Sequence, residues 1–343
     1  TANMNGNTIS SFTQTSGIFY GIYNTGNGTT ANNTIAGYTM GGTSSQYPFY
    51  LSNADMTAFG NTMSNINYTG TGIFYGFFVG SGNANSSFYN NTASTISCAG
   101  TTYGIYASFN AGLNVYGNSV TGLTTTGASN ISGIYQTGGS GITFNRNKIA
   151  NLTATNAGGS VFGINIVSGV TNVTNNVIGD LKTPAGNSAT ADIIRGISIT
   201  ATAASTTHNV SYNTIYLNAT STGAAFSTSG IFQTSSATAT SANLVLRNNI
   251  VINLSTPTGA GVTAAFRRST ATQLNNFDAS SNNNMFFAGT PSASRVIYME
   301  GTVVQQTLAN YKTWVTPRDV YSMTGEAFTY STAGSFFISL TPS

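Results

Sequence analysis

The polar pattern of this chain is dominated by one recurring tripeptide, an asparagine followed by any residue and then an apolar one. Successive copies of this asparagine are 26, 28, 30, 27, 29, 29, 37 and 35 residues apart. A unit that recurs at such a spacing is typical of a solenoid, in which each coil stacks on its neighbours. The recurring asparagines are Asn7, Asn33, Asn61, Asn91, Asn118, Asn147, Asn176, Asn213 and Asn248.

Apolar residues accompany each asparagine at fixed offsets. Around Asn147 they are Phe144 before it and Ile149 and Leu152 after it, and most other copies follow the same pattern. The apolar patches are short, separated by Gly, Asn, Ser and Thr, and rich in β-branched and aromatic residues, which indicates strands. The pattern predicts an all-β fold, a right-handed single-stranded parallel β-helix of about nine coils over residues 1–258.

The repeated asparagines have a physical reason to recur. Asparagine tolerates the left-handed backbone conformation that a sharp corner needs. Stacked copies can also pass amide hydrogen bonds from one coil to the next. We therefore expect these residues to occupy corners and to form a ladder. The two longest spacings predict insertions over residues 183–191 and 220–226 that project from one face.

Residues 259–343 are predicted to form a C-terminal cap that contains one short helix. Thr307 can cap this helix and Pro317 can end it. Such a cap would cover the unpaired strand edges of the last coil. No comparable cap precedes Asn7, so we expect either more chain upstream or end-to-end association with another molecule. The apolar residues expected on one face of the helix are Leu308, Tyr311 and Trp314.

Composition narrows the possible partners. Charged residues are 5% of the chain and the net charge is +3, so an electrostatic attachment to nucleic acid has no visible basis. No apolar run approaches the roughly 20 residues of a membrane span. The single cysteine, Cys98, excludes an intrachain disulfide. We interpret the chain as the mature part of an exported protein, secreted or displayed on the cell surface.

Two further segments carry a family resemblance. They are Ser281-Asn282-Asn283-Asn284-Met285-Phe286-Phe287 and Thr307-Leu308-Ala309-Asn310-Tyr311-Lys312-Thr313-Trp314, with Asp319 shortly after. Together with the Asn-x-Ile coils, they resemble large secreted β-helix proteins of Bacteroidetes-type bacteria, whose fold is similar to that of pectate lyases. The resemblance implies export to the cell surface, often by the type IX route, and a non-catalytic, adhesive role.

The ionisable residues offer no catalytic pair. Glycoside hydrolysis needs two carboxylates about 5 to 10 Å apart, and polysaccharide lyases need acidic calcium ligands with a base. No two acids of the repeats fall in one column of adjacent coils. His208 replaces apolar residues of other coils and is expected to be a hydrogen-bonded structural residue, with Cys98 too distant to pair with it. We predict no enzyme, metal site or cofactor. The acids are Asp55, Asp180, Asp192, Asp278, Glu300, Asp319 and Glu326.

Neutral surface residues are the remaining candidates for binding. Asp180 with Lys182, and Asp192 with Arg195, are expected as solvated ion pairs. We predict an extracellular structural or adhesive surface protein, with self-assembly into filaments, neighbouring surface proteins and glycans as its possible interactions. The alternatives are a carbohydrate-binding adhesin and, less favoured, a polysaccharide lyase or hydrolase. The candidate glycan-stacking residues are Tyr23, Tyr106 and Tyr135.

Overall fold

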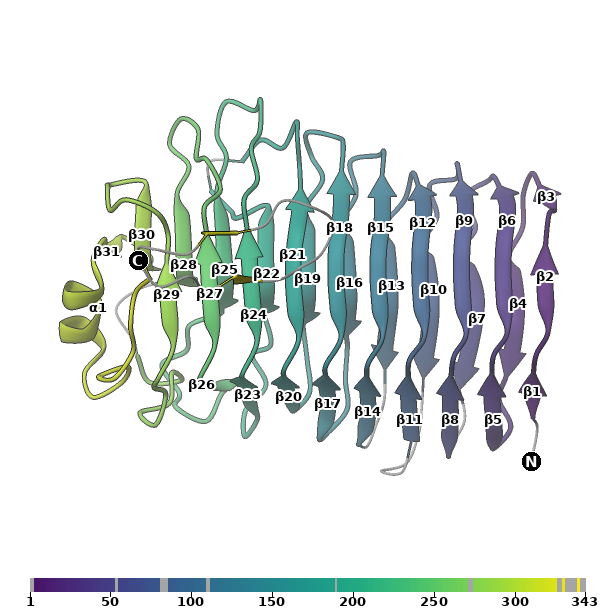
Figure 1. The fold of residues 1–343 in the computed structure, drawn as a ribbon, viewed down its shortest axis with the longest axis horizontal. Coiled ribbons are helices and arrows are strands. Elements are labelled where there is room, and N and C mark those ends of the chain that lie inside the picture. Colours follow the sequence, from purple (N-terminus) through teal and green to yellow (C-terminus); the bar gives the residue numbers. More distant parts are fainter. Residues whose placement is uncertain are drawn as a thin grey trace.

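The structure is a computed structural model that describes residues 3–52, 55–80, 86–108, 112–188, 190–270 and 274–325, together with residues 329–330 and 338–339. The described chain forms a parallel β-solenoid of about ten coils with one short helix near its C-terminal end (Figure 1). Each regular coil gives one strand to each of three sheets, which we name A, B and C. The predicted all-β parallel β-helix with a short C-terminal helix is confirmed.

The strands follow one another in the order A, B, C along the chain. Sheet A consists of β1 (Met4–Asn5), β5 (Gly28–Ala31), β8 (Met56–Phe59), β11 (Ser86–Tyr89), β14 (Leu113–Tyr116), β17 (Ile142–Asn145), β20 (Thr171–Thr174), β23 (Thr207–Ser211) and β26 (Asn243–Arg247). Sheet B consists of β2 (Thr8–Ser10), β6 (Thr34–Met40), β9 (Thr62–Tyr68), β12 (Thr92–Cys98), β15 (Ser119–Thr125), β18 (Lys148–Ala154), β21 (Val177–Lys182), β24 (Thr214–Leu217), β27 (Ile250–Asn253) and β29 (Met285–Phe287), and β3 (Thr13–Gln14) also pairs with β6.

Sheet C carries the longest uninterrupted series of aromatic residues. It consists of β4 (Phe19–Asn24), β7 (Gln46–Ser52), β10 (Phe74–Gly80), β13 (Thr102–Ser108), β16 (Ile131–Gln136), β19 (Val161–Ile166), β22 (Ile194–Ile199), β25 (Thr228–Gln233), β28 (Thr263–Arg268), β30 (Arg295–Glu300) and β31 (Val303–Gln305). The described strands β32 (Thr329–Tyr330) and β33 (Ile338–Ser339) pair with each other.

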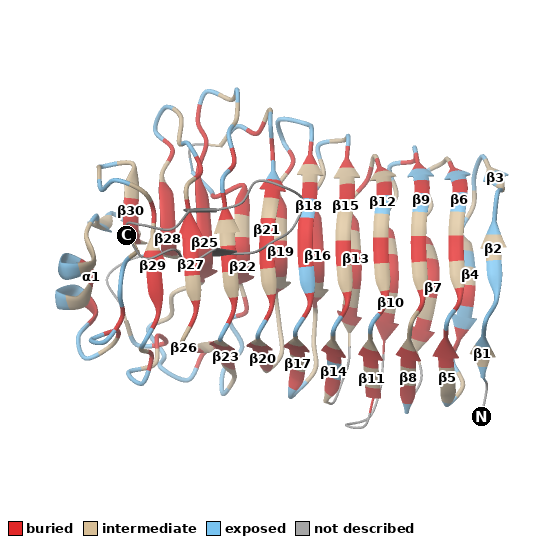
Figure 2. Cartoon of the chain, in the orientation of Figure 1, coloured by how far each residue is buried: buried red, intermediate tan, exposed pale blue. Residues whose placement is uncertain are grey.

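The core is a set of apolar columns that run through the middle of the stack. Ile149 pairs in register with Val120 of the preceding coil and Ile178 of the following one, and all three are buried. Inward residues alternate with outward ones along most strands, so buried and partly exposed positions alternate in Figure 2. Stacking of like apolar residues therefore stabilises each coil through its neighbours.

The sharp corner between sheets A and B has a left-handed residue, but it is not the ladder asparagine. The residue just before each ladder position has a positive φ, for example 56° at Asn32 and 55° at Arg146. The expectation that the ladder asparagines themselves are left-handed is therefore wrong. The full set of preceding residues is Gly6, Asn32, Gly60, Asn90, Gly117, Arg146, Asn175, Tyr212, Asn248 and Asn283.

The ladder itself connects every coil to the next. At Asn147, the side-chain Nδ2 donates to Asn176 Oδ1 at 2.9 Å and to the Val115 carbonyl at 3.0 Å. Its Oδ1 accepts from both the Nδ2 and the backbone N–H of Asn118. Equivalent Nδ2-to-Oδ1 bonds of 2.8–3.1 Å join the other steps. The buried amides are thus satisfied, as their burial requires.

The prediction that Asn248 belongs to the ladder is wrong. Asn213 Nδ2 donates to Asn249 at 3.0 Å, and Asn249 donates to Asn284 at 2.9 Å, whereas Asn248 takes the left-handed corner position with φ 56°. The sequence offers two adjacent asparagines here, and the tripeptide pattern selects the first. The same one-residue shift places Leu246, and not the residue before it, in register with Val210.

The solenoid continues beyond the predicted boundary at residue 258. Strands β28, β29 and β30 pair in parallel with the preceding coils, so the coil pattern extends to Glu300. The helix α1 (Leu308–Val315) then lies beside β30 and β31, at the opposite end of the rod from β1 (Figure 1). The Thr307 side chain caps it by accepting the Asn310 N–H.

The buried face of α1 differs from the prediction. Tyr311 and Val315 are fully buried and Leu308 packs against the core, but the Trp314 side chain is 38% exposed. Tyr311 and Val315 are four residues apart and so lie on one helical face, while Trp314 is turned away from it. Trp314 is therefore not part of the contact with the last coil.

The two predicted insertions lie where the sequence places them, between sheets B and C. They pack on each other, because Ser188 N donates to the Ala225 carbonyl at 2.8 Å and Thr222 N donates to the Pro184 carbonyl at 2.9 Å. The described residues of the two insertions are thus hydrogen-bonded extensions of two stacked coils.

Candidate functional site

The most distinctive surface of the described chain is a double row of aromatic residues on the outside of sheet C. It spans the five consecutive strands β4, β7, β10, β13 and β16. The first row lies near the start of each strand, and the second lies three residues later. We name this surface the aromatic face. Its first row is Tyr20, Tyr47, Tyr75 and Tyr103, and its second row is Tyr23, Tyr50, Phe78, Tyr106 and Tyr135.

Local backbone geometry explains why two aromatic residues of β4, β7, β10 and β13 point outward. In β10, Tyr75 and Phe78 are partly exposed, while Gly76 and Phe77 between them are buried. A Cβ on Gly76 would lie 2.5 Å from Met63 Cε and 2.7 Å from the Gly104 carbonyl oxygen. The close approach favours glycine at this inward position of β4, β10, β13 and β16, whereas β7 has Pro48 there.

The rings form a herringbone. Within a row, most neighbouring rings are nearly parallel, with centroids 4.9 Å apart for Tyr23 and Tyr50 and 4.6 Å for Tyr50 and Phe78. Between rows most are nearly perpendicular, at 76° for Tyr47 and Tyr50 and 77° for Tyr75 and Phe78. The arrangement is less regular at Tyr103, whose ring is tilted by 40° from that of Tyr75. Each such pair adds about 0.5–1.5 kcal/mol beyond area burial. Because neighbours cover the ring faces inside a row, the face presents mainly ring edges and hydroxyl groups to solvent.

Partial burial raises the pKa of several tyrosines of this face above the ordinary value. Partial burial raises the pKa of Tyr75 to about 12, with further increases from the nearby Tyr47, Tyr106 and Tyr135. Burial likewise raises the pKa of Tyr103 and of Tyr135. The aromatic face is thus uncharged at physiological pH and carries hydroxyl groups that both donate and accept hydrogen bonds.

The three predicted stacking tyrosines all belong to the second row, which adds Tyr50 and Phe78 to them. The first row was not predicted from the sequence. The signal was present one residue before the recognised glycine, as in Tyr20-Gly21 and Tyr103-Gly104.

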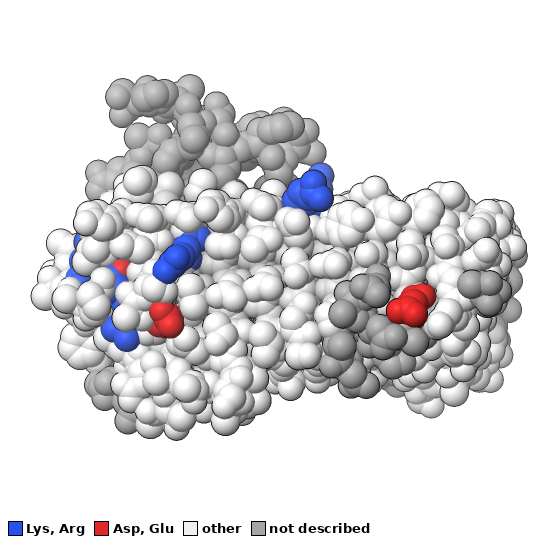
Figure 3. Space-filling view, turned by 90° about the horizontal axis from the view of Figure 1, so that it is seen from below, with Lys and Arg blue, Asp and Glu red and all other residues white. Residues whose placement is uncertain are grey.

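Charged residues appear only where these rows continue into later coils. The first row proceeds through Phe162 and Arg195, and the second through Phe232 and Arg267. Figure 3 shows one side of the molecule, on which few charged side chains interrupt a mostly neutral surface. The aromatic face therefore offers a ligand no charge, and the strands beyond it do.

The predicted ion pairs are of two kinds. Lys182 and Asp180 are 2.7 Å apart with side chains 47% and 40% exposed, as expected for a solvated pair. Asp192 is instead buried and bonded to Arg267, while the Arg195 guanidinium lies 3.5 Å from the centroid of the Phe232 ring. Burial raises the pKa of Asp192, and the two arginines oppose this increase. The expectation of a solvated Asp192 pair is wrong.

Other acids take part in structural networks. The buried Glu300 carboxylate accepts from Arg268 Nη1 at 2.9 Å. Asp319 accepts from the Tyr311 hydroxyl at 2.5 Å. Among the residues that the structure describes, no group of three or more His, Cys, Asp or Glu could hold a metal ion. Glu326 lies outside the described residues.

His208 and Cys98 are both in the core. His208 pairs in register with Thr171 and Leu244, and neither ring nitrogen has a hydrogen-bond partner among the described residues. His208 is therefore a buried structural residue, but the expected hydrogen bond is not found among the described residues. Burial lowers its pKa to about 4. Burial raises the pKa of Cys98 to about 12. Both side chains are buried and both pKa values lie far from 7, whereas a catalytic residue at neutral pH needs contact with its substrate and a pKa near 7.

Within the described ranges, no helix is long and apolar enough to cross a membrane. Comparison of the chain with models of protein families, with curated proteins and with solved structures finds no match.

Proposed function

We propose that this chain is an extracellular structural or adhesive β-helix that holds neutral polysaccharide along its aromatic face. The observation that carries the proposal is the unbroken herringbone of nine rings on β4, β7, β10, β13 and β16, without a charged residue among them. An exposed apolar surface of this extent is typical of an interaction site.

The chemistry of the face suits a sugar chain. Aromatic edges and phenol hydroxyls offer both apolar contact and hydrogen bonds, which matches a pyranose with its C–H faces and equatorial hydroxyls. The rows run along the solenoid axis with rings 4.6 to 5.5 Å apart. An extended β-linked glycan advances by a similar distance per sugar. Five strands at about 4.8 Å each would contact four or five sugars in a line.

The first coil adds the most accessible rings. The side chains of Tyr20 and Tyr23 are 44% and 49% exposed, more than the rings of later coils. End-to-end self-association of the chain stays a prediction from the sequence.

A sedimentation assay with insoluble polysaccharides tests the proposal. The chain is mixed with cellulose, chitin, mannan or, as an acidic comparison, calcium pectate gel, and the bound fraction is measured. We expect binding to at least one neutral polysaccharide, reduced tenfold or more by the double variant Tyr50→Ala, Tyr106→Ala.

A matched control removes stacking from another surface. Tyr89 on sheet A stacks on Phe59 at 5.0 Å and on Tyr116 at 4.8 Å, so Tyr89→Ala loses comparable contacts away from the aromatic face. This variant should bind as the unmodified chain does. The proposal would be refuted if the chain bound none of the neutral polysaccharides. It would also be refuted if Tyr89→Ala reduced binding as much as the double variant does. Antibody labelling of intact producing cells tests the extracellular location.

A further inference from the structure

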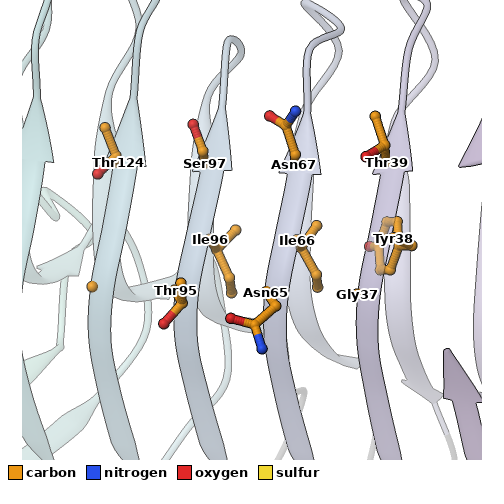
Figure 4. A pocket seen from close by; sticks show the side chains of 11 residues that line it. Gly37, Tyr38, Thr39, Asn65, Ile66, Asn67, Thr95, Ile96, Ser97 and Thr124 are labelled. Atoms are coloured by element: carbon orange, nitrogen blue, oxygen red, sulfur yellow. The ribbon is translucent and has the colours of Figure 1, made fainter. Parts of the chain in front are cut away.

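A second surface, on the outside of sheet B, is hollowed into a groove. It has a volume of about 310 Å³ and crosses the four consecutive strands β6, β9, β12 and β15 (Figure 4). Its long direction therefore follows the solenoid axis, as the rows of the aromatic face do. Sheets B and C are different sides of the same rod.

The groove exists because each of these strands contains one left-handed residue. They are Gly37, Asn65, Thr95 and Gly122, with φ of 65°, 53°, 54° and 69°. A single left-handed residue between extended stretches makes a bulge and bends the strand. The bulges stack coil on coil, so the bends add up to a continuous hollow. A β-branched residue such as Thr95 is rarely found in this conformation.

The walls of the groove are neutral and rich in hydrogen-bonding groups. Asn65 and Thr95 lie in one row across the strands, with Asn67 and Ser97 in a parallel row, and Ile66 and Ile96 are between them (Figure 4). The side chains of Asn65, Asn67 and Thr95 are exposed. No hydrogen bond from these side chains occurs within the described part of the chain.

In the next two coils, the residues at the bulge position are bonded to another side chain of the protein. There the bulge residues are Asn151 and Asp180, and Lys182 bonds both of them, at 3.4 Å and 2.7 Å. The side chains of Asn151 and Asp180 are thus bonded within the protein, whereas those of Asn65, Asn67 and Thr95 have no hydrogen bond among the residues that the structure describes. This difference confines the available donors and acceptors to the neutral stretch.

We propose that the groove binds a second neutral glycan chain, so that one molecule bridges two polysaccharide chains on two of its sides. This inference rests on the proposed function of the aromatic face. Amide and hydroxyl side chains recognise sugar hydroxyls because they can both donate and accept hydrogen bonds. The absence of charge among the lining residues favours a neutral ligand over an acidic one.

A peptide strand is a poorer fit. The backbones of β9, β12 and β15 are paired to neighbouring coils on both edges, so no free strand edge is offered to a peptide. Side-chain recognition alone remains, and it suits a ligand whose polar groups point outward along its length, such as a glycan.

Calorimetric titration of the full chain with the hexasaccharide of a polysaccharide that binds in the sedimentation assay tests the inference. We expect two sites per chain. The double variant Asn65→Gly, Asn67→Ala keeps the left-handed backbone but removes both amides, and should weaken one site about tenfold, as expected for about 1.4 kcal/mol of lost hydrogen bonding. The variant Ser97→Trp should fill the groove and abolish that site.

Two comparisons separate the surfaces. Asn114→Ala removes an exposed amide from β14 of sheet A and should leave both sites intact. Tyr50→Ala, Tyr106→Ala should remove the other site only. With the corresponding soluble polysaccharide, the unmodified chain should raise turbidity by cross-linking, and either defective variant should not.

The outcomes are distinguishable. One site that responds to the tyrosine variants and not to Ser97→Trp would overturn the bridging inference and leave the proposed function standing. One site that responds only to the groove variants would overturn both the role of the aromatic face and bridging. Binding to none of the neutral polysaccharides would overturn both proposals.

Discussion

Acidification should destabilise the solenoid through His208. The unfolded chain carries this histidine with an ordinary pKa near 6.5, whereas burial lowers the pKa in the folded chain to about 4. Between these values the unfolded state binds the proton and the folded state does not, so falling pH favours unfolding. The stability is complete above pH 6.5 and is lost as pH falls toward 4. At about 1.4 kcal/mol per pKa unit, the full loss is about 3 kcal/mol.

The variant His208→Leu isolates this effect. Leucine suits the position because Leu113 and Ile142 occupy it in other coils and Leu244 is its neighbour in register. Burial raises the pKa of other groups, including Asp192, so their effect on stability has the opposite sign and the pH profile of one protein alone is mixed. The difference between the two proteins cancels these contributions.

Urea unfolding followed by circular dichroism at pH 7, 6, 5 and 4 measures the difference. We expect His208→Leu to gain about 3 kcal/mol relative to the unmodified chain between pH 7 and pH 4. A difference that stays constant over this range would show that His208 is solvated or hydrogen-bonded in the folded state, and would refute the reasoning.

Three further predictions concern the core. Glu300→Gln leaves the buried Arg268 without its carboxylate and should cost about 3–5 kcal/mol of unfolding free energy, read in urea titrations. Asn249→Ala breaks the ladder and should cost about 2–4 kcal/mol, whereas Asn248→Gly, at a left-handed corner, should change stability by less than about 1 kcal/mol; similar losses would contradict the ladder assignment. Cys98 should resist alkylation in the native chain and react after unfolding, as followed by mass spectrometry, because it is buried and its pKa is raised to about 12.

Periodicity predicts the interior of this fold well, because the core repeats with the coil. The inward positions around Asn147 follow directly from the sequence, since stacked coils require like residues at like positions. The pattern fails where two adjacent asparagines both fit the repeat. Asn248 and Asn249 differ only in backbone conformation, which the tripeptide pattern does not encode.

The outer surfaces are less predictable. Thr95 and Gly122 occupy the same bulge position, yet their side chains share no property that would predict a left-handed backbone at both. The groove of sheet B could therefore not be derived from residue types. The first aromatic row was missed for another reason, because the motif was read from its glycine onward and Tyr20 precedes that glycine.

The asparagine ladder would allow the solenoid to gain or lose coils without a change in how the coils bond to one another. Each ladder asparagine inside the stack accepts through its Oδ1 from the preceding coil and donates through its Nδ2 to the following coil. A coil duplicated in the gene would therefore make the same hydrogen bonds as its neighbours. At the last step, Asn284 Nδ2 donates to Asp319 Oδ1, and the Asp319 side chain has no amide group that could donate to a further coil. Duplication or loss of a coil that carries both surfaces, between Asn33 and Asn118, would thus lengthen or shorten both in step, while Asp319 would still end the series.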